Sequence, residues 1–370
     1  MEKSEYGKYA ALMIYLIRCV LEDKKPRKER LEGAECDKLF IVARAHNLAA
    51  ITAYALEAAG IKHEAFEQAR DKAIRKNILL DTERKAVLAE MEAAGIWYMP
   101  LKGAFLHEWY PRLGMRQMAD NDILFDRSRA EDVKKIFLGR GYRCKLYGMT
   151  NHDIYLKEPV YNFEMHSALF SKRFHDGRLY NYYKDVDKRL IKDEDSEYGR
   201  HFSPGDFYLY MLAYEYKHFS GSGTGIRSLV DTYVFLKRFE DRLDLEYIAK
   251  EAGKLGIREF EENNMCLALK LFRGGRLDAE EKKLLSYYVF SGTYGNLENS
   301  VKNNLKKNDG SRLKYIKKRL FPPADLLQLT APWVKKSPLL LPAGWVYRIV
   351  YRTVKGRKRL LKEAEILLRK

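Results

Sequence analysis

The hydrophobic residues of this chain change their spacing twice along its length. Up to about residue 92 they recur every three or four residues, as in YAALMIYLIRCVL, which predicts helices. From 95 to about 172 the apolar runs become short and aromatic, as in IWYMPL and VYNFEMHSAL, which predicts strands. From Pro204 onward the helical spacing returns. We therefore expect an α+β fold in which a small mixed sheet is flanked by helices on both sides in sequence.

These changes predict four segments. Residues 1–94 form an N-terminal helical region, residues 95–200 an α/β core and residues 201–306 a helical bundle. The polar stretch KNDGS at 307–311 ends the bundle. Residues 311–370 then form a basic C-terminal extension, with 16 Lys or Arg against 3 acidic residues.

The net charge of +17 predicts a polyanionic partner, because a basic surface attracts phosphates. Nucleic acid, nucleotides and an anionic membrane all fit this charge. The four cysteines are far apart and form no CxxC pair, so neither a disulfide framework nor a zinc knuckle is indicated, and a reducing compartment is favoured. No apolar run reaches the roughly 18 residues of a spanning helix. We expect a cytoplasmic protein that is at most associated with a membrane surface.

Two carboxylates stand out in the stretch MADNDILFD. Side chains two apart on a strand share a face, so Asp120 and Asp122 point the same way, about 6.6 Å apart along the backbone. Such a pair repels unless a cation lies between the charges, and Mg²⁺ bound to nucleotide phosphate meets this need. A solvated edge strand is the simpler alternative. Asn121 points to the opposite, core side and needs a hydrogen-bond partner there.

A third carboxylate comes from the stretch VYNFEMHSA. Its alternation puts Phe163 and Met165 on an apolar face and Glu164 and His166 on the opposite, polar face. Glu164 therefore projects from another strand of the same sheet. With no third nitrogen or sulfur donor nearby, we expect His166 to form a hydrogen bond within the site rather than to bind zinc.

Several basic residues are suited to contact the phosphates of a nucleotide. Lys102 and Gly103 lie directly after one strand and before a short helix, and Arg116 precedes the next strand. Arg227 suits bidentate phosphate contacts, although a solvated surface arginine explains it equally well.

The run SGSGTG at 220–225 separates two predicted helices. It lacks the flanking strand and the Lys-Ser or Lys-Thr of a phosphate-binding loop, so we interpret it as a turn. His218 and Asp231 lie on either side of it. They either form a hydrogen bond that closes the helical hairpin or bind a base or an acceptor.

Taken in order, these motifs resemble the uncharacterised bacterial nucleotidyltransferases of the DNA polymerase β superfamily, the group labelled NTP-transferase family 5. The resemblance runs from the N-terminal helices to about residue 240. It rests on Leu101, Lys102 and Gly103, Tyr110 and Pro111, Arg116, Asp120 and Asp122, Glu164 and His166, and His218, Arg227 and Asp231. Superfamily members usually carry Gly-Gly or Gly-Ser where this chain has Lys102-Gly103, and an apolar residue where it has Asn121.

The resemblance implies that residues 95–200 form a nucleotidyltransferase core. It would move a nucleoside monophosphate from an NTP to an acceptor hydroxyl with release of pyrophosphate. Asp120, Asp122 and Glu164 would be catalytic and hold two Mg²⁺ or Mn²⁺ ions, with Glu164 completing the second metal site or accepting the proton of the acceptor. The nucleotide would be contacted by Lys102, Gly103, Arg116, His166, His218, Arg227 and Asp231. The acceptor stays open: small molecule, protein and RNA all fit.

The alternative is a non-catalytic basic protein that binds RNA or an anionic membrane surface. In the C-terminal extension, PLLLPAGW leads into a basic helix that also carries Tyr347 and Tyr351. This order suits an anchor in the membrane interface better than a surface that reads bases. An ordinary helix with a solvated basic face is the simplest interpretation of the same pattern.

Overall fold

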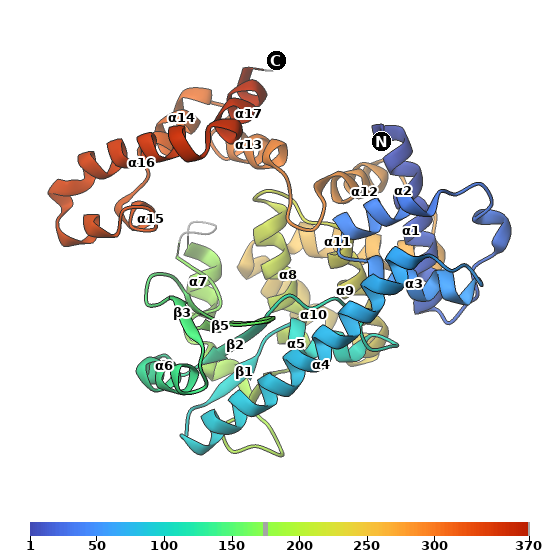
Figure 1. The fold of residues 1–370 in the computed structure, drawn as a ribbon, viewed down its shortest axis with the longest axis horizontal. Helices are drawn as coiled ribbons and strands as arrows, with labels where there is room; N and C mark the ends of the chain where they lie inside the picture. Colours follow the sequence, from blue (N-terminus) through green and yellow to red (C-terminus); the bar gives the residue numbers. More distant parts are fainter. Residues whose placement is uncertain (173–176, 369–370) are drawn as a thin grey trace. The chain divides into compact units, whose positions relative to one another are not determined.

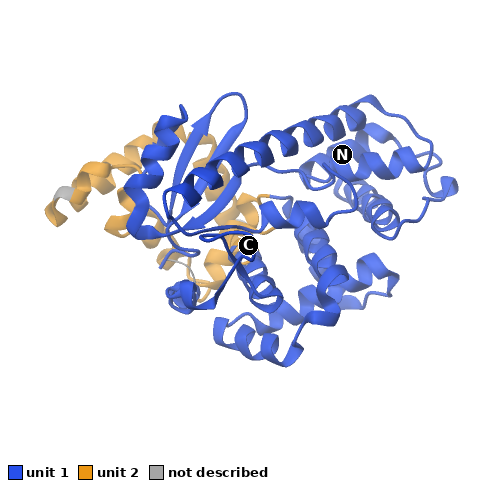
Figure 2. Cartoon of the chain, turned by 90° about the horizontal axis from the view of Figure 1, so that it is seen from below, with its two compact units in different colours: residues 1–217, 225–293 blue, residues 218–224, 294–370 orange. Residues whose placement is uncertain are grey.

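The computed structural model describes residues 1–172 and 177–368. Residues 173–176 of the predicted core and residues 369–370 of the predicted extension lie outside this description. The chain divides into two compact units, one made of residues 1–217 and 225–293 and the other of residues 218–224 and 294–370 (Figure 2). The division into four predicted segments stays a prediction.

The large unit begins with helices, as the apolar spacing predicts. They are α1 (Lys3–Leu21), α2 (Cys36–Ala45), α3 (Ala49–Ala58) and α4 (Glu64–Ala93). The sequence from Lys38 to Gly60 has helical spacing throughout, yet the chain breaks between α2 and α3, where Asn47 takes a left-handed φ of 53°. The break lets α2 and α3 both pack against α1.

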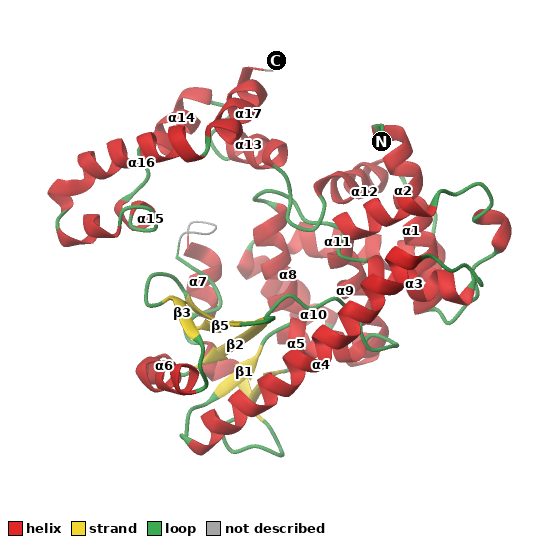
Figure 3. Ribbon diagram, in the orientation of Figure 1, coloured by secondary structure: helices red, strands yellow, loops and turns green. Residues whose placement is uncertain are grey.

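A five-stranded mixed sheet follows (Figure 3). Its strands are β1 (Tyr98–Pro100), β2 (Asn121–Phe125), β3 (Arg143–Leu146), β4 (His152–Lys157) and β5 (Tyr161–His166). The order across the sheet is β1-β2-β5-β4-β3, and only β2 and β5 are parallel. A two-stranded sheet of β6 (Leu190–Lys192) and β7 (Arg200–Phe202) lies next to β1. The predicted α+β class with a small mixed sheet is confirmed.

One face of the five-stranded sheet forms the core of this region. Helix α4 and helix α6 (Ala130–Gly139) cover that face (Figure 1). Met91 of α4 packs with Ile123 and Met165 of the central strands, and Phe137 of α6 stacks on Tyr155 at 4.3 Å between ring centroids. Because side chains alternate along a strand, the residues between these apolar ones point to the opposite face.

Seven further helices among the described residues belong to the large unit. They are α5 (Gly103–Trp109), α7 (Arg178–Tyr183), α8 (Pro204–Phe219), α9 (Ile226–Phe239), α10 (Leu245–Leu255), α11 (Arg258–Leu269) and α12 (Ala279–Ser291). Of these, α8 to α11 follow the helical spacing predicted from Pro204 onward. Helix α5 packs on α9 through Trp109, which makes edge contacts with Phe207 and Phe239.

The smaller unit is helical. Its helices are α13 (Leu297–Lys306), α14 (Arg312–Leu320), α15 (Ala324–Leu327), α16 (Leu341–Lys355) and α17 (Arg357–Leu368). A small apolar core of Leu327, Ala331 and Val334 holds α15 and α16 together, and Trp345 donates a hydrogen bond to the carbonyl of Pro322 at 2.9 Å. Among the described residues, no helix is both long and apolar enough to cross a bilayer.

Candidate functional site

The open face of the sheet carries carboxylates because of the register between β2 and β5. These parallel strands pair Asp122 with Glu164 and Leu124 with His166. Ile123 and Met165 point into the core, so Asp122, Glu164 and His166 point away from it, as their alternation predicts. Asp120 differs slightly from expectation, since β2 begins at Asn121 and this aspartate immediately precedes the strand.

Asn121 fixes the two aspartates against helix α4. Its side chain is fully buried, accepts a hydrogen bond from Nη1 of Arg84 at 3.1 Å and donates one to the carbonyl of Leu80 at 3.0 Å. These contacts supply the partner that its core position requires. Just before the strand, Lys76 donates a hydrogen bond to the carbonyl of Ala119 at 2.9 Å. The residues on both sides of Asp120 are therefore anchored to the same helix.

The three carboxylates perturb one another. Burial raises the pKa of Asp120 to about 6, with the charges of Asp122 and Glu164 adding to the effect. Burial and the charge of Asp122 also raise the pKa of Glu164. Asp122 behaves oppositely: burial would raise its pKa, but a hydrogen bond with Nε2 of His166 at 2.9 Å and the His166 charge hold it well below its usual range. The donor set therefore fits a divalent cation, which would relieve this repulsion.

Two lysines face these carboxylates. Nζ of Lys102 lies 2.7 Å from the ring centroid of Tyr214, and Nζ of Lys217 lies 4.0 Å from the same centroid. Burial lowers the pKa of Lys102 to about 7 against the opposing charge of Asp122. Burial likewise lowers the pKa of Lys217 to about 8 against Asp122 and Glu164. A bound triphosphate would stabilise the charged form of both amines.

Sequence reasoning missed Tyr214 and Lys217. They lie three residues apart on α8 and therefore share one face of that helix. That spacing is visible in the sequence, but nothing local indicates that this face points toward the sheet.

Sequence reasoning also missed His152, which is the first residue of β4. The antiparallel register pairs His152 with His166, and the two rings lie 5.1 Å apart between centroids. Nε2 of His152 lies 3.7 Å from Oε2 of Glu164. Burial and the charge of His166 lower the pKa of His152 to about 4, so its ring is neutral at neutral pH. The hydrogen bond expected for His166 within the site is the one it forms with Asp122.

Arg116 and Asp231 form a buried ion pair. The guanidinium donates from Nε to Oδ1 at 2.8 Å and from Nη2 to Oδ2 at 3.0 Å, and the Tyr110 hydroxyl donates to Oδ1 at 2.7 Å. The pair joins the segment before β2 to α9. A Cβ on Gly103 would lie 3.4 Å from Nη1 of Arg116, so the glycine allows α5 to begin against this pair. Contact of Gly103, Arg116 and Asp231 with a nucleotide stays a prediction.

Arg227 and His218 lie on either side of the SGSGTG turn. Arg227, half-buried in the first turn of α9, is close enough for its charge to oppose the burial-driven rise in the pKa of Asp120. His218 belongs to the smaller unit, where its carbonyl accepts hydrogen bonds from the amides of Gly221 and Gly223, both at 3.0 Å. The run is a turn between α8 and α9, as expected.

A sheet face with two aspartates around one strand residue, a glutamate on the parallel neighbour and lysines opposite them suits the class of enzymes that act on nucleotide phosphates through divalent cations. The family comparison agrees with this class. Residues 32–273 match the family described as an uncharacterised nucleotidyltransferase, and the chain belongs to that family. The match includes every candidate residue from Lys102 to Asp231. No curated protein and no solved structure matches the chain.

Proposed function

We propose that this nucleotidyltransferase moves a nucleoside monophosphate from an NTP to the hydroxyl of an acceptor by metal-assisted chemistry. The observation that carries the proposal is the pairing of Asp122 with Glu164 on parallel strands, with Asp120 directly before the first strand. Lys102 and Lys217 complete the arrangement, because their charges act on the same carboxylates.

Asp120, Asp122 and Glu164 would hold two divalent ions, Mg²⁺ or Mn²⁺, which neutralise the triphosphate and stabilise the leaving pyrophosphate. Glu164 also suits the role of base, because burial raises its pKa and a more basic carboxylate accepts a proton more readily. The acceptor oxygen would attack the α-phosphorus and lose its proton to Glu164. The bond from the α-phosphorus to the oxygen that bridges to the β-phosphate would break, and pyrophosphate would leave.

The basic residues divide between binding and positioning. Lys102, Lys217 and Arg227 would contact the phosphate oxygens. Arg116 would act through Asp231 by holding the segment before β2 in place. His166 would orient Asp122 through their hydrogen bond. Contact of His218 with the base or the acceptor stays a prediction.

Calorimetric titration of ATP, GTP, CTP and UTP into the full chain, in Mg²⁺ and in EDTA, tests the metal requirement. Binding of at least one NTP should need Mg²⁺, because three carboxylates repel a bare triphosphate. Equal binding in EDTA would contradict the proposal.

The double substitution of Asp120→Asn with Asp122→Asn tests the role of the aspartates. It should abolish pyrophosphate release while leaving the fold intact, because the repulsion removed at Asp120 offsets the weakened contact of residue 122 with His166. Asp132→Asn is the matched control, because this aspartate lies on α6 in ion pairs with Arg129 and Lys135. An active double variant would refute the assignment.

A second proposal concerns the smaller unit, which we propose binds to the surface of an anionic bilayer. Along one side of α16 five apolar side chains are exposed at successive turns, although a helix on the surface of a globular protein normally turns its apolar side toward the core. They are Val346, Tyr347, Val350, Tyr351 and Val354. The excess of 13 positive charges in residues 311–370 complements anionic lipid, at about 1 kcal/mol for each basic residue near the surface.

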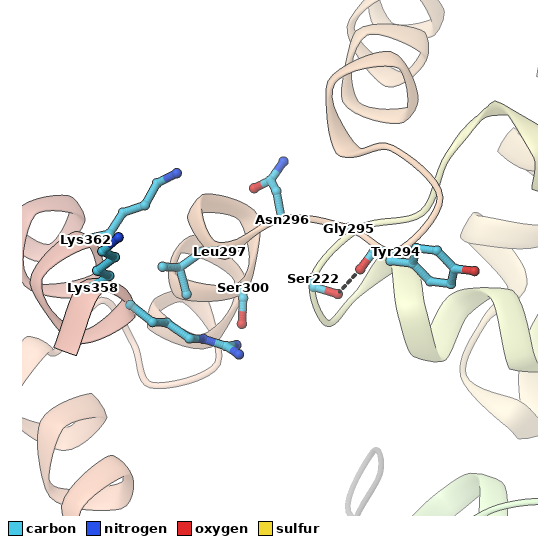
Figure 4. A pocket seen from close by; sticks show the side chains of 9 residues that line it. Ser222, Tyr294, Gly295, Asn296, Leu297, Ser300, Lys358 and Lys362 are labelled. Carbon is cyan, nitrogen blue, oxygen red and sulfur yellow. Dashed lines mark hydrogen bonds between the residues drawn. The ribbon is translucent and has the colours of Figure 1, made fainter. Parts of the chain in front are cut away.

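The same unit contains an open hollow of about 410 Å³ with a basic wall (Figure 4). Lys358, Arg359 and Lys362 of α17 line it, together with Leu297 and Ser300 of α13. Its size and charge suit a phosphate headgroup.

Sedimentation with vesicles of neutral or anionic lipid over a salt series tests membrane contact. Binding should require anionic lipid and weaken with salt. The paired change of Val350→Asp with Val354→Asp should abolish it and leave Mg²⁺-NTP binding unchanged. Leu313→Asp, at another exposed apolar position of the unit, is the control. Pelleting with neutral vesicles, or with RNA alone, would overturn the proposal.

A further inference from the structure

The sheet face that carries the aspartates also holds a pair of histidines. His152 and His166 lie directly opposite each other on antiparallel β4 and β5, and both flank Glu164. Nε2 of His152 and Nε2 of His166 lie 3.7 Å and 4.0 Å from Oε2 of Glu164. One donor atom from each of the three residues lies within 4.8 Å of the other two. Two nitrogens and one oxygen therefore converge on one small volume.

Hydrogen bonding to Glu164 does not account for this convergence, and Nε2 of His166 would have to give up its hydrogen bond to Oδ1 of Asp122, at 2.9 Å, to bind an ion. The separation of 3.7 Å between His152 and Glu164 is too long for a hydrogen bond, and so is the 4.0 Å between His166 and Glu164. A shared ion would account for both distances. In a tetrahedral site with metal–nitrogen bonds of about 2.0–2.1 Å, neighbouring ligand atoms lie about 3.3 Å apart. The three side chains thus need to move by less than an ångström each.

The donor types identify the class of ion. Mg²⁺ binds oxygen ligands and takes imidazole poorly, whereas Zn²⁺, Mn²⁺ and Fe²⁺ accept a mixture of imidazole and carboxylate. Two histidines and one glutamate are also the protein ligands of zinc enzymes that keep a fourth position open.

The charges around the cluster favour a cation. Among the described residues, the lysines whose charges act on Glu164 are Lys102 and Lys217, and the carboxylates beside them are Asp120 and Asp122. Together with Glu164, these carboxylates outnumber the lysines, and an imidazole that binds a metal is neutral because the ion takes the place of its proton.

We propose that His152, His166 and Glu164 bind one transition-metal ion of the Zn²⁺ class beside the aspartates, with a position left for water or an acceptor oxygen. The catalytic use of this ion rests on the proposed function, but its binding does not. The two ions of the proposed function would then be of different kinds: Mg²⁺ on the two aspartates with the triphosphate, and a nitrogen-bound ion on the side of β4, with Glu164 as its ligand rather than as the base.

Metal titration of the full chain, stripped with EDTA, tests the site without nucleotide. Co²⁺ serves as the probe, because its visible absorption strengthens when nitrogen ligands hold it in a four-coordinate site. Zn²⁺ and Mg²⁺ are then added in competition. The wild type should bind one Zn²⁺ at least about 100-fold more tightly than Mg²⁺. His152→Ala should weaken Zn²⁺ binding about 10-fold or more and change Mg²⁺ binding by less than about twofold.

Two further variants keep the test decisive. His201→Ala is the matched control, because this histidine pairs with Asp193 at 2.6 Å on the separate β6–β7 sheet. His152→Asn replaces the alanine variant if thermal unfolding in EDTA shows that the latter is misfolded. Equal Zn²⁺ affinity in the His152 and His201 variants, or a wild type that prefers Mg²⁺, would overturn the inference.

Mg²⁺-NTP binding by the same samples separates the two proposals. Zn²⁺ binding that depends on His152, without any NTP binding, would support the metal site and refute the proposed transfer. Mg²⁺-dependent NTP binding, together with a Zn²⁺ affinity that His152→Ala does not change, would refute the metal site and support the proposed transfer.

Discussion

Asn121 lies between the two aspartates and offers a direct test of how the site is held. In Asn121→Leu the strand loses its hydrogen bond from the Arg84 guanidinium and its own donation to the carbonyl of Leu80. A hydrogen bond to a charged group contributes about 1.5–3 kcal/mol and a neutral one about 0.5–1.5 kcal/mol. Arg84 keeps its ion pair with Asp81 at 2.7 Å, and leucine gains some apolar burial, so both losses are moderated. We expect the free energy of unfolding to fall by about 2–3 kcal/mol.

Urea unfolding followed by circular dichroism measures this change, and a double-mutant cycle assigns it. Combining Asn121→Leu with Arg84→Met should reveal a coupling energy of about 1.5 kcal/mol or more, because each single change removes the same bond. Asn263→Leu, on the exposed side of α11, is the control and should stay within about 0.5 kcal/mol of wild type. A loss at Asn121 no larger than this control, or a coupling near zero, would refute the reasoning.

Three further outcomes are expected. Arg116→Met should lower the free energy of unfolding, measured in urea, by about 3–5 kcal/mol, because the buried carboxylate of Asp231 loses its guanidinium partner. A fall below about 1 kcal/mol would show that the ion pair is dispensable. Lys217→Met should weaken NTP binding about 10-fold in calorimetry, whereas the control Lys135→Met, at an exposed position of α6, should not. Equal affinities of the two variants would remove Lys217 from the site. Mg²⁺-NTP binding should weaken as the pH falls through about 6, where Asp120 gains a proton. Because the folded pKa of Asp120 is raised, the stability that this group contributes is present below its unfolded pKa and is lost as the pH rises through about 6. Asp120→Asn should abolish that loss in pH-dependent unfolding, and an unchanged profile would contradict the raised pKa.

The period of the apolar residues was enough to predict the fold class and the faces of the strands. Alternation placed Phe163 and Met165 in the core and Glu164 on the open face, and it also required a buried partner for Asn121. These features are local, because side chains two apart on a strand share a face whatever the strand pairs with.

The register between strands is not local, and this is why His152 was missed. Its position opposite His166 depends on how β4 and β5 pair, and strand alternation says nothing about pairing. Lys217 was missed for a related reason, since helical spacing shows that it shares a face with Tyr214 but not what that face covers. Arg116 and Asp231 form an ion pair but lie 115 residues apart in the sequence, so no local pattern connects them.

The parallel pairing of β2 and β5 has a consequence for how the protein is made. Parallel neighbours need a crossover, and here α6, β3 and β4 all lie between the two strands in the chain. During synthesis Asp120 and Asp122 leave the ribosome well before Glu164, and Lys217 follows later still. A nascent or truncated chain that ends before β5 therefore carries an exposed aspartate pair without the partners that make it selective. Non-local contacts of this kind form late and slowly, so binding competence should arise only after the ribosome has passed α8.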